Sequence, residues 1–125
     1  NYADRSEGAR LGIFKDTPDN NVSRYLMPQE CGNRTGIRWL KVTDRAGRSL
    51  RFLAVGKPFE GSVLPYSAEE LEAATHQEEL PLPRYTYVTV LAANRGVGGD
   101  DSWGAPVYPE YCISGEKDIE FSFEI

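Results

Sequence analysis

Two adjacent aspartates and a tryptophan lie in a glycine-rich segment of the chain. Residues 95–107 contain four glycines and one proline, and they include Asp100, Asp101 and Trp103. Glycines such as Gly99 let the backbone adopt conformations closed to other residues and approach a ligand closely. An indole ring stacks on the apolar face of a sugar, while aspartates bind hydroxyls or accept the loop's own amide protons. The residues therefore predict a sugar-binding loop or, alternatively, a turn in which Trp103 plugs the end of a β-sandwich.

Catalysis by the other carboxylates or by the histidine is less well supported. A glycosidase needs two carboxyl groups, and the chain has 19 Asp and Glu residues. Five of them lie on faces of a predicted helix or strand that water would cover, namely Glu69, Glu70, Glu72, Glu120 and Glu124. Glu30, Asp100 and Asp101 instead lie in loops flanked by glycine. His76, the only histidine, lies at a predicted helix end, where positive charge favours the terminus. No nucleophile motif accompanies it, so we expect a structural role.

Length and charge limit the function further. A chain of 125 residues suits one core, and we expect residues 1–125 to form a single domain. The net charge of -5 disfavours nucleic acid and anionic membrane surfaces as partners. No apolar run approaches the roughly 20 residues that span a bilayer. The polar start lacks a signal peptide and does not begin with Met, so we expect a piece of a longer protein.

The two cysteines give no disulfide framework. Cys31 and Cys112 are far apart in the sequence, and we favour two free thiols over a bridge, which stays open as the alternative. A zinc site is disfavoured because no paired-cysteine spacing exists and the chain has one histidine. P-loop and EF-hand patterns are also absent. We therefore expect no cofactor or metal on this chain.

The elements that must position these residues are mainly β-strands. Alternation and turn residues predict a strand at 36–43, a turn at 44–47 and a returning strand at 50–55. Aromatic and β-branched residues predict a strand at 85–92. Residues 118–125 alternate cleanly and predict a half-buried strand with Ile119, Phe121, Phe123 and Ile125 on one face. Residues 22–27 can extend until Pro28 ends them.

One short helix is predicted near residues 67–76. Ser67 caps it, and Glu70 three residues later completes a capping box. Leu71 and Ala74 would face the core, and the prolines at 81–83 stop the helix. The expected fold is therefore mainly β, an antiparallel β-sandwich with one short helix.

Several motifs in order carry a family resemblance. The segment Val97–Val107, with Gly-Gly-Asp-Asp-Ser-Trp at 98–103, closely resembles a signature of the large bacterial β-galactosidases of glycoside hydrolase family 2. Further segments are similar to the same family: Asn1–Arg5, Tyr25 with Pro28–Arg34, Arg38–Leu40 and Tyr66–Leu71. The resemblance extends over nearly the whole chain.

The resemblance implies a fold and a set of roles. The chain resembles the latter part of the C-terminal supersandwich domain, which is related to the galactose mutarotase fold. It implies that Trp103 forms an apolar platform for the sugar, with Gly99, Asp100 and Asp101 in the same substrate-binding loop. It also implies an active-site-adjacent loop of Glu30, Cys31, Gly32 and Arg34. Cys31 replaces the family's usual Asn, which puts polar contacts at that position in doubt.

The same resemblance implies what lies outside this chain. The catalytic glutamates of a retaining β-galactosidase belong to a TIM barrel, and none maps here. The Mg²⁺ and Na⁺ of family members are bound in other domains, and the full-length enzyme is expected to be a homo-oligomer that hydrolyses terminal β-D-galactosides. The alternatives are a stand-alone carbohydrate-binding module and a purely structural or oligomerisation sandwich.

Overall fold

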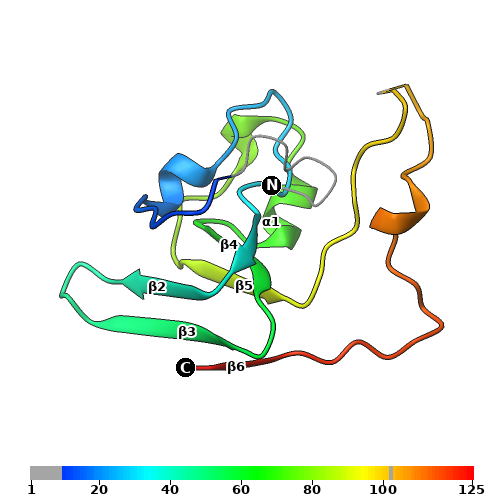
Figure 1. Cartoon of the computed structure of the whole chain (residues 1–125). Helices are drawn as coiled ribbons and strands as arrows, with labels where there is room; N and C mark the ends of the chain where they lie inside the picture. The colour runs from blue at the N-terminus through cyan, green and yellow to red at the C-terminus, as the bar shows by residue number, and fades with distance from the viewer. Residues whose placement is uncertain (1–9, 102) are drawn as a thin grey trace. The chain divides into compact units, whose positions relative to one another are not determined.

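A computed structural model describes residues 10–101 and 103–125 (Figure 1). The chain divides into two compact units. Among the described residues, the first unit comprises Arg34–Gly61 and most of Val90–Ile125. The second comprises Arg10–Asn33 and Ser62–Thr89. Within the described part, no helix is long and apolar enough to cross a bilayer.

One three-stranded sheet in the first unit has the order β2-β3-β6. β2 (Trp39–Thr43) and β3 (Ser49–Val55) form an antiparallel hairpin, and β3 also pairs with β6 (Ser122–Glu124). The predicted turn is confirmed. The carboxylate of Asp44 accepts the amide proton of Arg48 at 2.8 Å, and Gly47 has a φ of 83°, which only glycine adopts easily.

A second sheet has the order β1-β4-β5. It contains β1 (Arg34–Ile37), β4 (Phe59–Leu64) and β5 (Tyr87–Leu91). The single strand predicted at 36–43 is therefore wrong, because the chain leaves β1 before it enters β2. Gly36 has a φ of 64°, a left-handed conformation that interrupts regular pairing, and the register of β1 with β4 shifts at this point.

Aromatic side chains connect the two sheets within the first unit. Phe123 of β6 lies 6.0 Å from the ring of Phe52 and 6.3 Å from that of Phe59, measured between ring centroids. Phe59 is 1% exposed, and burial of such a side chain contributes about 1.5–3 kcal/mol. The mainly-β, antiparallel fold with sandwich-like packing is thus confirmed.

The predicted helix is confirmed in the second unit, although it is shorter than expected. α1 spans Ala68–Ala73. Ser67 Oγ accepts the Glu70 amide proton at 3.1 Å, and Glu70 Oε2 accepts the Ser67 amide proton at 2.9 Å, so the capping box forms. Leu71 and Ala74 are buried as predicted.

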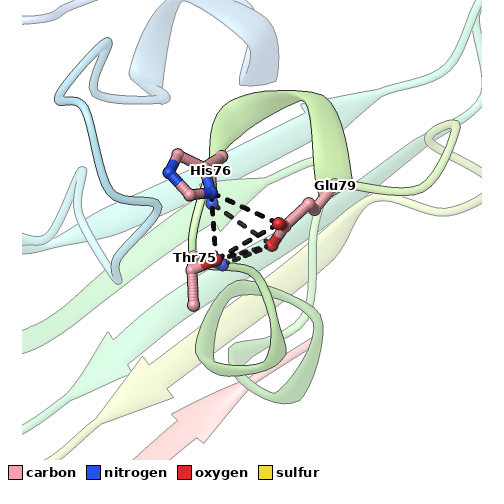
Figure 2. A network of polar contacts seen from close by, with 3 residues as sticks. All are labelled: Thr75, His76 and Glu79. Atoms are coloured by element: carbon pink, nitrogen blue, oxygen red, sulfur yellow. Dashed lines mark hydrogen bonds and ion pairs between the residues drawn. The ribbon is translucent and has the colours of Figure 1, made fainter.

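The helix ends early, and the side chain of Glu79 stabilises a new turn directly after it. Its carboxylate accepts the backbone N–H of Thr75 at 2.7 Å and the hydroxyl of Thr75 at 2.9 Å. His76 then leads into the 3-10 turn η3 (Gln77–Glu79), and its ring nitrogen lies 3.3 Å from the same carboxylate (Figure 2). His76 therefore does not stabilise the end of α1, contrary to the prediction from the sequence. It has a structural role instead, in a polar network with Thr75 and Glu79.

One other strand prediction is corrected. Residues 22–27, which the sequence allows to extend, follow the 3-10 turn η2 (Pro18–Asn21) and pair in no sheet of the described residues. The strand predicted at 118–125 shrinks to β6, and its apolar side chains are exposed rather than half-buried; Phe121 is 42% and Ile125 76% exposed. The reason is that β6 pairs only with the end of β3, so little of the chain covers its apolar face.

Candidate functional site

The loop that bears Trp103 is closed at its base. It connects β5 to β6 and includes the 3-10 turn η4 (Pro109–Tyr111) (Figure 1). The amide of Gly96 donates a hydrogen bond to the carbonyl oxygen of Tyr111 at 2.8 Å, which joins the two ends of the loop. Gly96 and Gly98 are buried, so the stem of the loop is ordered by its own backbone.

Asp101 organises the tip of this loop. Its Oδ1 accepts the backbone N–H of Trp103 at 2.7 Å and that of Ala105 at 3.3 Å. This is the Asx-turn arrangement expected of an aspartate that satisfies its own loop. Because both bonds go to the carboxylate, Asp101 fixes the backbone on each side of the indole.

Asp100 and Gly99 connect the tip of the loop to its returning segment, residues 105–108. The hydroxyl of Tyr108 donates a hydrogen bond to Asp100 Oδ1. A Cβ added at Gly99 would lie 2.5 Å from the carbonyl oxygen of Pro106, so the two sides of the loop approach too closely for any side chain there. The expected close approach at this glycine is thus made by the loop's own backbone. Tyr108 was missed in the sequence because nothing local connects it with Asp100.

Trp103 projects from this framework into the surroundings. It is 95% exposed, the most exposed large apolar side chain of the described residues. The alternative in which Trp103 plugs the end of the sandwich is therefore not what the chain adopts. Leaving an indole in water costs free energy, so an exposed tryptophan on a hydrogen-bonded loop is typical of a recognition surface. The placement of Ser102 lies outside the described residues.

The loop that contains Cys31 lies in the second unit and is also held by short polar contacts. The thiol of Cys31 accepts the backbone N–H of Ser23 at 3.2 Å and donates to the carbonyl oxygen of Asn21 at 3.3 Å. The sulfur thus supplies one weak donor and one weak acceptor at this position, fewer than the two N–H donors and the carbonyl oxygen of an asparagine amide.

Gly32 is required where it stands. Its φ is 72°, and a Cβ would lie 3.1 Å from the carbonyl oxygen of Asn21. Glu30 is exposed in the same unit, whereas Arg34 is exposed at the start of β1 in the other unit. The predicted loop residues are thus divided between the units, and the Trp103 loop belongs to the first.

A shallow cleft of about 240 Å³ lies in the second unit beside the Cys31 loop. Its lining includes Ser23, Arg24, Tyr66 and Gln77. Ser23 is the residue whose amide Cys31 accepts, and the side chain of Gln77 donates to the carbonyl oxygen of Tyr25 at 2.6 Å. The cleft is therefore built from the same segment that the Cys31 thiol orders.

The cysteines of the described residues are free thiols, and the carboxylates of the Trp103 loop are engaged in local hydrogen bonds. Across residues 10–101 and 103–125, no group of three or more His, Cys, Asp or Glu side chains could hold a metal ion, so these residues do not fit a metal centre. The carboxylates of Asp100 and Asp101 are both occupied by donors of their own loop.

The fold and this loop define a class: a mainly-β protein that carries an exposed aromatic side chain on an ordered, aspartate-held loop. Comparison with known proteins is more specific. The family described as beta-galactosidase small chain matches residues 1–125, and the chain belongs to that family.

Individual relatives agree with this membership. The chain is 50% identical over its whole length to a beta-galactosidase from Halalkalibacterium halodurans, of which it covers 12%. It is 43% identical over 99% of its length to the beta-galactosidase BgaC of Bifidobacterium adolescentis, again covering 12%. A beta-galactosidase small subunit from Latilactobacillus sakei is 42% identical over 99% of the chain, which covers 42% of that protein. The chain thus spans a small part of the relatives that it matches.

Proposed function

We propose that this chain is the small-chain part of a retaining β-galactosidase, which hydrolyses terminal β-D-galactosides, and that it binds substrate without cleaving it. Trp103 supplies an apolar platform for the sugar or aglycone, and Asp100, Asp101 and Gly99 hold that platform in place. The two catalytic glutamates, and any Mg²⁺ or Na⁺, belong to a larger catalytic part, a TIM barrel. The assembled enzyme is a homo-oligomer.

The observation that carries this proposal is the 95% exposure of Trp103 on a loop whose polar groups bind one another. A loop backbone held this way is preorganised, so little backbone entropy is lost when a sugar stacks on the ring that it carries. Family membership and the beta-galactosidase names of the relatives supply the substrate class. The Cys31 loop, with Glu30, Gly32 and Arg34, is proposed to border the same active site.

The decisive experiment replaces Trp103 by Ala in the complete enzyme. We expect substrate binding to weaken by about 1–3 kcal/mol from lost stacking and burial, which is about 5- to 150-fold in KM. If the indole binds ground state and transition state equally, kcat changes little. Trp103→Phe should recover part of the loss, because a phenyl ring also stacks on a sugar.

Phe14→Ala provides the matched control, since Phe14 is an aromatic residue that is 76% exposed and lies outside the Trp103 loop. It should leave KM unchanged. Wild-type kinetics in the Trp103→Ala enzyme would favour a purely structural sandwich instead. The isolated chain should not turn over a chromogenic β-galactoside and should bind no galactose at millimolar concentration in titration calorimetry. Measurable heat there would favour a stand-alone carbohydrate-binding module.

A further inference from the structure

Positive charge is concentrated around the β2–β3 hairpin. Residues 34–57 hold seven of the chain's 14 Lys and Arg residues but only one of its 19 Asp and Glu residues, Asp44. The whole chain nevertheless has a net charge of -5. A positive region on an otherwise acidic chain favours docking in one orientation, because it attracts a negative surface on a partner.

The register of the hairpin sorts its side chains onto two faces. Trp39 is opposite Leu53 and Lys41 is opposite Arg51, so these four lie on the same face, which we call the hairpin outer face. The hydrogen bond between Thr43 Oγ1 and Ser49 Oγ, 2.8 Å long, continues this face towards the turn.

The opposite face is the one that serves the core of the unit. Leu40 is opposite Phe52 on it, and Phe52 packs against Phe123. The outer face therefore plays no part in that aromatic cluster.

The outer face combines two adjacent cations with apolar area, and Glu124 of β6 lies opposite Leu53 at its margin without an ion pair to either cation among the described residues. Like charges directly opposite each other destabilise a sheet, and Lys41 and Arg51 are such a pair. The guanidinium of Arg51 lies 5.4 Å from the ring centroid of Trp39, which offsets part of the cost. Among the described residues, however, neither cation forms an ion pair. Trp39 is 41% and Leu53 38% exposed, so the same face offers apolar surface for burial.

We propose that the hairpin outer face docks onto a carboxylate-bearing segment of the larger part of the enzyme. A carboxylate placed between Lys41 and Arg51 converts their repulsion into two charge-assisted contacts. Burial of Trp39 and Leu53 around it excludes water and strengthens them. The larger partner is inferred from membership of a small-chain family, so this inference rests on the proposed function.

Other occupants fit this face less well. A second copy that used the same face would set Lys41 and Arg51 against their own equivalents, and like charges in such a symmetric interface repel. A polyanion such as nucleic acid would meet a chain whose net charge is -5. An acidic polypeptide segment satisfies the cation pair and also buries the indole of Trp39 beside it.

Photo-crosslinking in the assembled enzyme tests the proposal. With p-benzoylphenylalanine in place of Leu53, we expect a crosslink to a peptide of the larger part that contains Asp or Glu. The combined changes Lys41→Glu and Arg51→Glu should lower the yield by about tenfold, as the loss of charge complementarity predicts. The matched control, Arg45→Glu with Lys57→Glu, makes the same charge change in the hairpin turn and just after β3, outside the four residues of the outer face, and should leave the yield unchanged.

Three results would overturn the proposal: no crosslink, a crosslink to a second copy of this chain, or one to a segment without carboxylates. Circular dichroism of each variant checks that the hairpin still folds. The probe placed at Leu50, which is 59% exposed on the opposite face, should give a yield that does not respond to the Lys41 and Arg51 changes. If the crosslinking prediction fails while Trp103→Ala still raises KM, the docking surface alone is rejected. A wild-type KM in the Trp103→Ala enzyme would instead reject the proposed function.

Discussion

At the scale of single residues, the carboxylate of Asp101 stands out because it binds the backbone on both sides of Trp103. Hydrogen bonds to a charged acceptor contribute about 1.5–3 kcal/mol, more than neutral ones. The indole itself contacts little else, since it is 95% exposed. The backbone that carries Trp103 is therefore positioned by Asp101, whereas packing contributes little to holding the indole ring.

Asp101→Ala should release the Trp103 loop without unfolding the chain. The amide protons of Trp103 and Ala105 then lose their carboxylate acceptor and bind water instead. We therefore expect faster nanosecond motion of the indole and a higher KM in the complete enzyme. Time-resolved fluorescence anisotropy measures the motion in a Trp39→Phe background, where Trp103 is the only tryptophan. Asp101→Asn keeps an acceptor oxygen and should restore most of the order. Equal anisotropy decay in all three proteins would contradict this role for Asp101.

At the scale of elements, prediction from the sequence works where the determining contacts are local. The capping box joins Ser67 and Glu70, and the hairpin turn joins Asp44 and Arg48, so each motif is legible within a few residues. β4 was missed because Gly61 interrupts its apolar pattern, and its pairing partner β1 is distant in sequence.

The candidate site follows the same rule. Gly-Gly-Asp-Asp-Ser-Trp predicts a loop with an exposed aromatic, and Asp101 bonds to residues close to it. The bond from Tyr108 to Asp100 and the contacts of the Cys31 thiol depend on how the loops close. No sequence spacing specifies these longer connections, so they emerge only from the folded chain.

The turn after α1 should be sensitive to acid. Hydrogen bonds from the backbone and hydroxyl of Thr75, with a contribution from His76, lower the pKa of Glu79 to about 2 from an ordinary 4.5 (Figure 2). A carboxyl whose folded pKa is depressed stabilises the fold fully above its unfolded pKa, and that contribution is lost as the pH falls through the folded value. The turn should therefore be intact at pH 5 and loosen between about pH 4.5 and 2.

An NMR titration of the Thr75 amide measures this transition. Its chemical shift should move with a midpoint near the pKa of Glu79, about 2. Glu79→Gln should abolish the titration and weaken the turn at neutral pH, whereas Glu78→Gln, a change at the adjacent exposed carboxylate, should leave it in place. A midpoint near 4.5 in the unmodified chain would show that Thr75 does not hold the carboxylate.

At the scale of the whole molecule, apolar surface exceeds what the described residues cover. The sheet β2-β3-β6 ends in two edge strands, and the face that carries Phe52 leaves other large side chains in water. Leu50 is 59%, Phe123 36% and Ile125 76% exposed. Open edges beside exposed apolar faces favour pairing with other chains, so the surroundings of this sheet in the complete enzyme are expected to be protein rather than water.

The isolated chain should therefore self-associate through this sheet. Sedimentation velocity across a range of micromolar concentrations should show larger species as concentration rises, because association buries Leu50 and Ile125 and satisfies the free edge of β6. Replacing both Leu50 and Ile125 by Lys should shift the chain towards monomer, since charged side chains on this face oppose association. The control Ile13→Lys changes an exposed apolar residue of the second unit, 82% exposed, and should have little effect. A strictly monomeric chain at every concentration would mean that this face tolerates water, and that the sheet needs no partner to be stable.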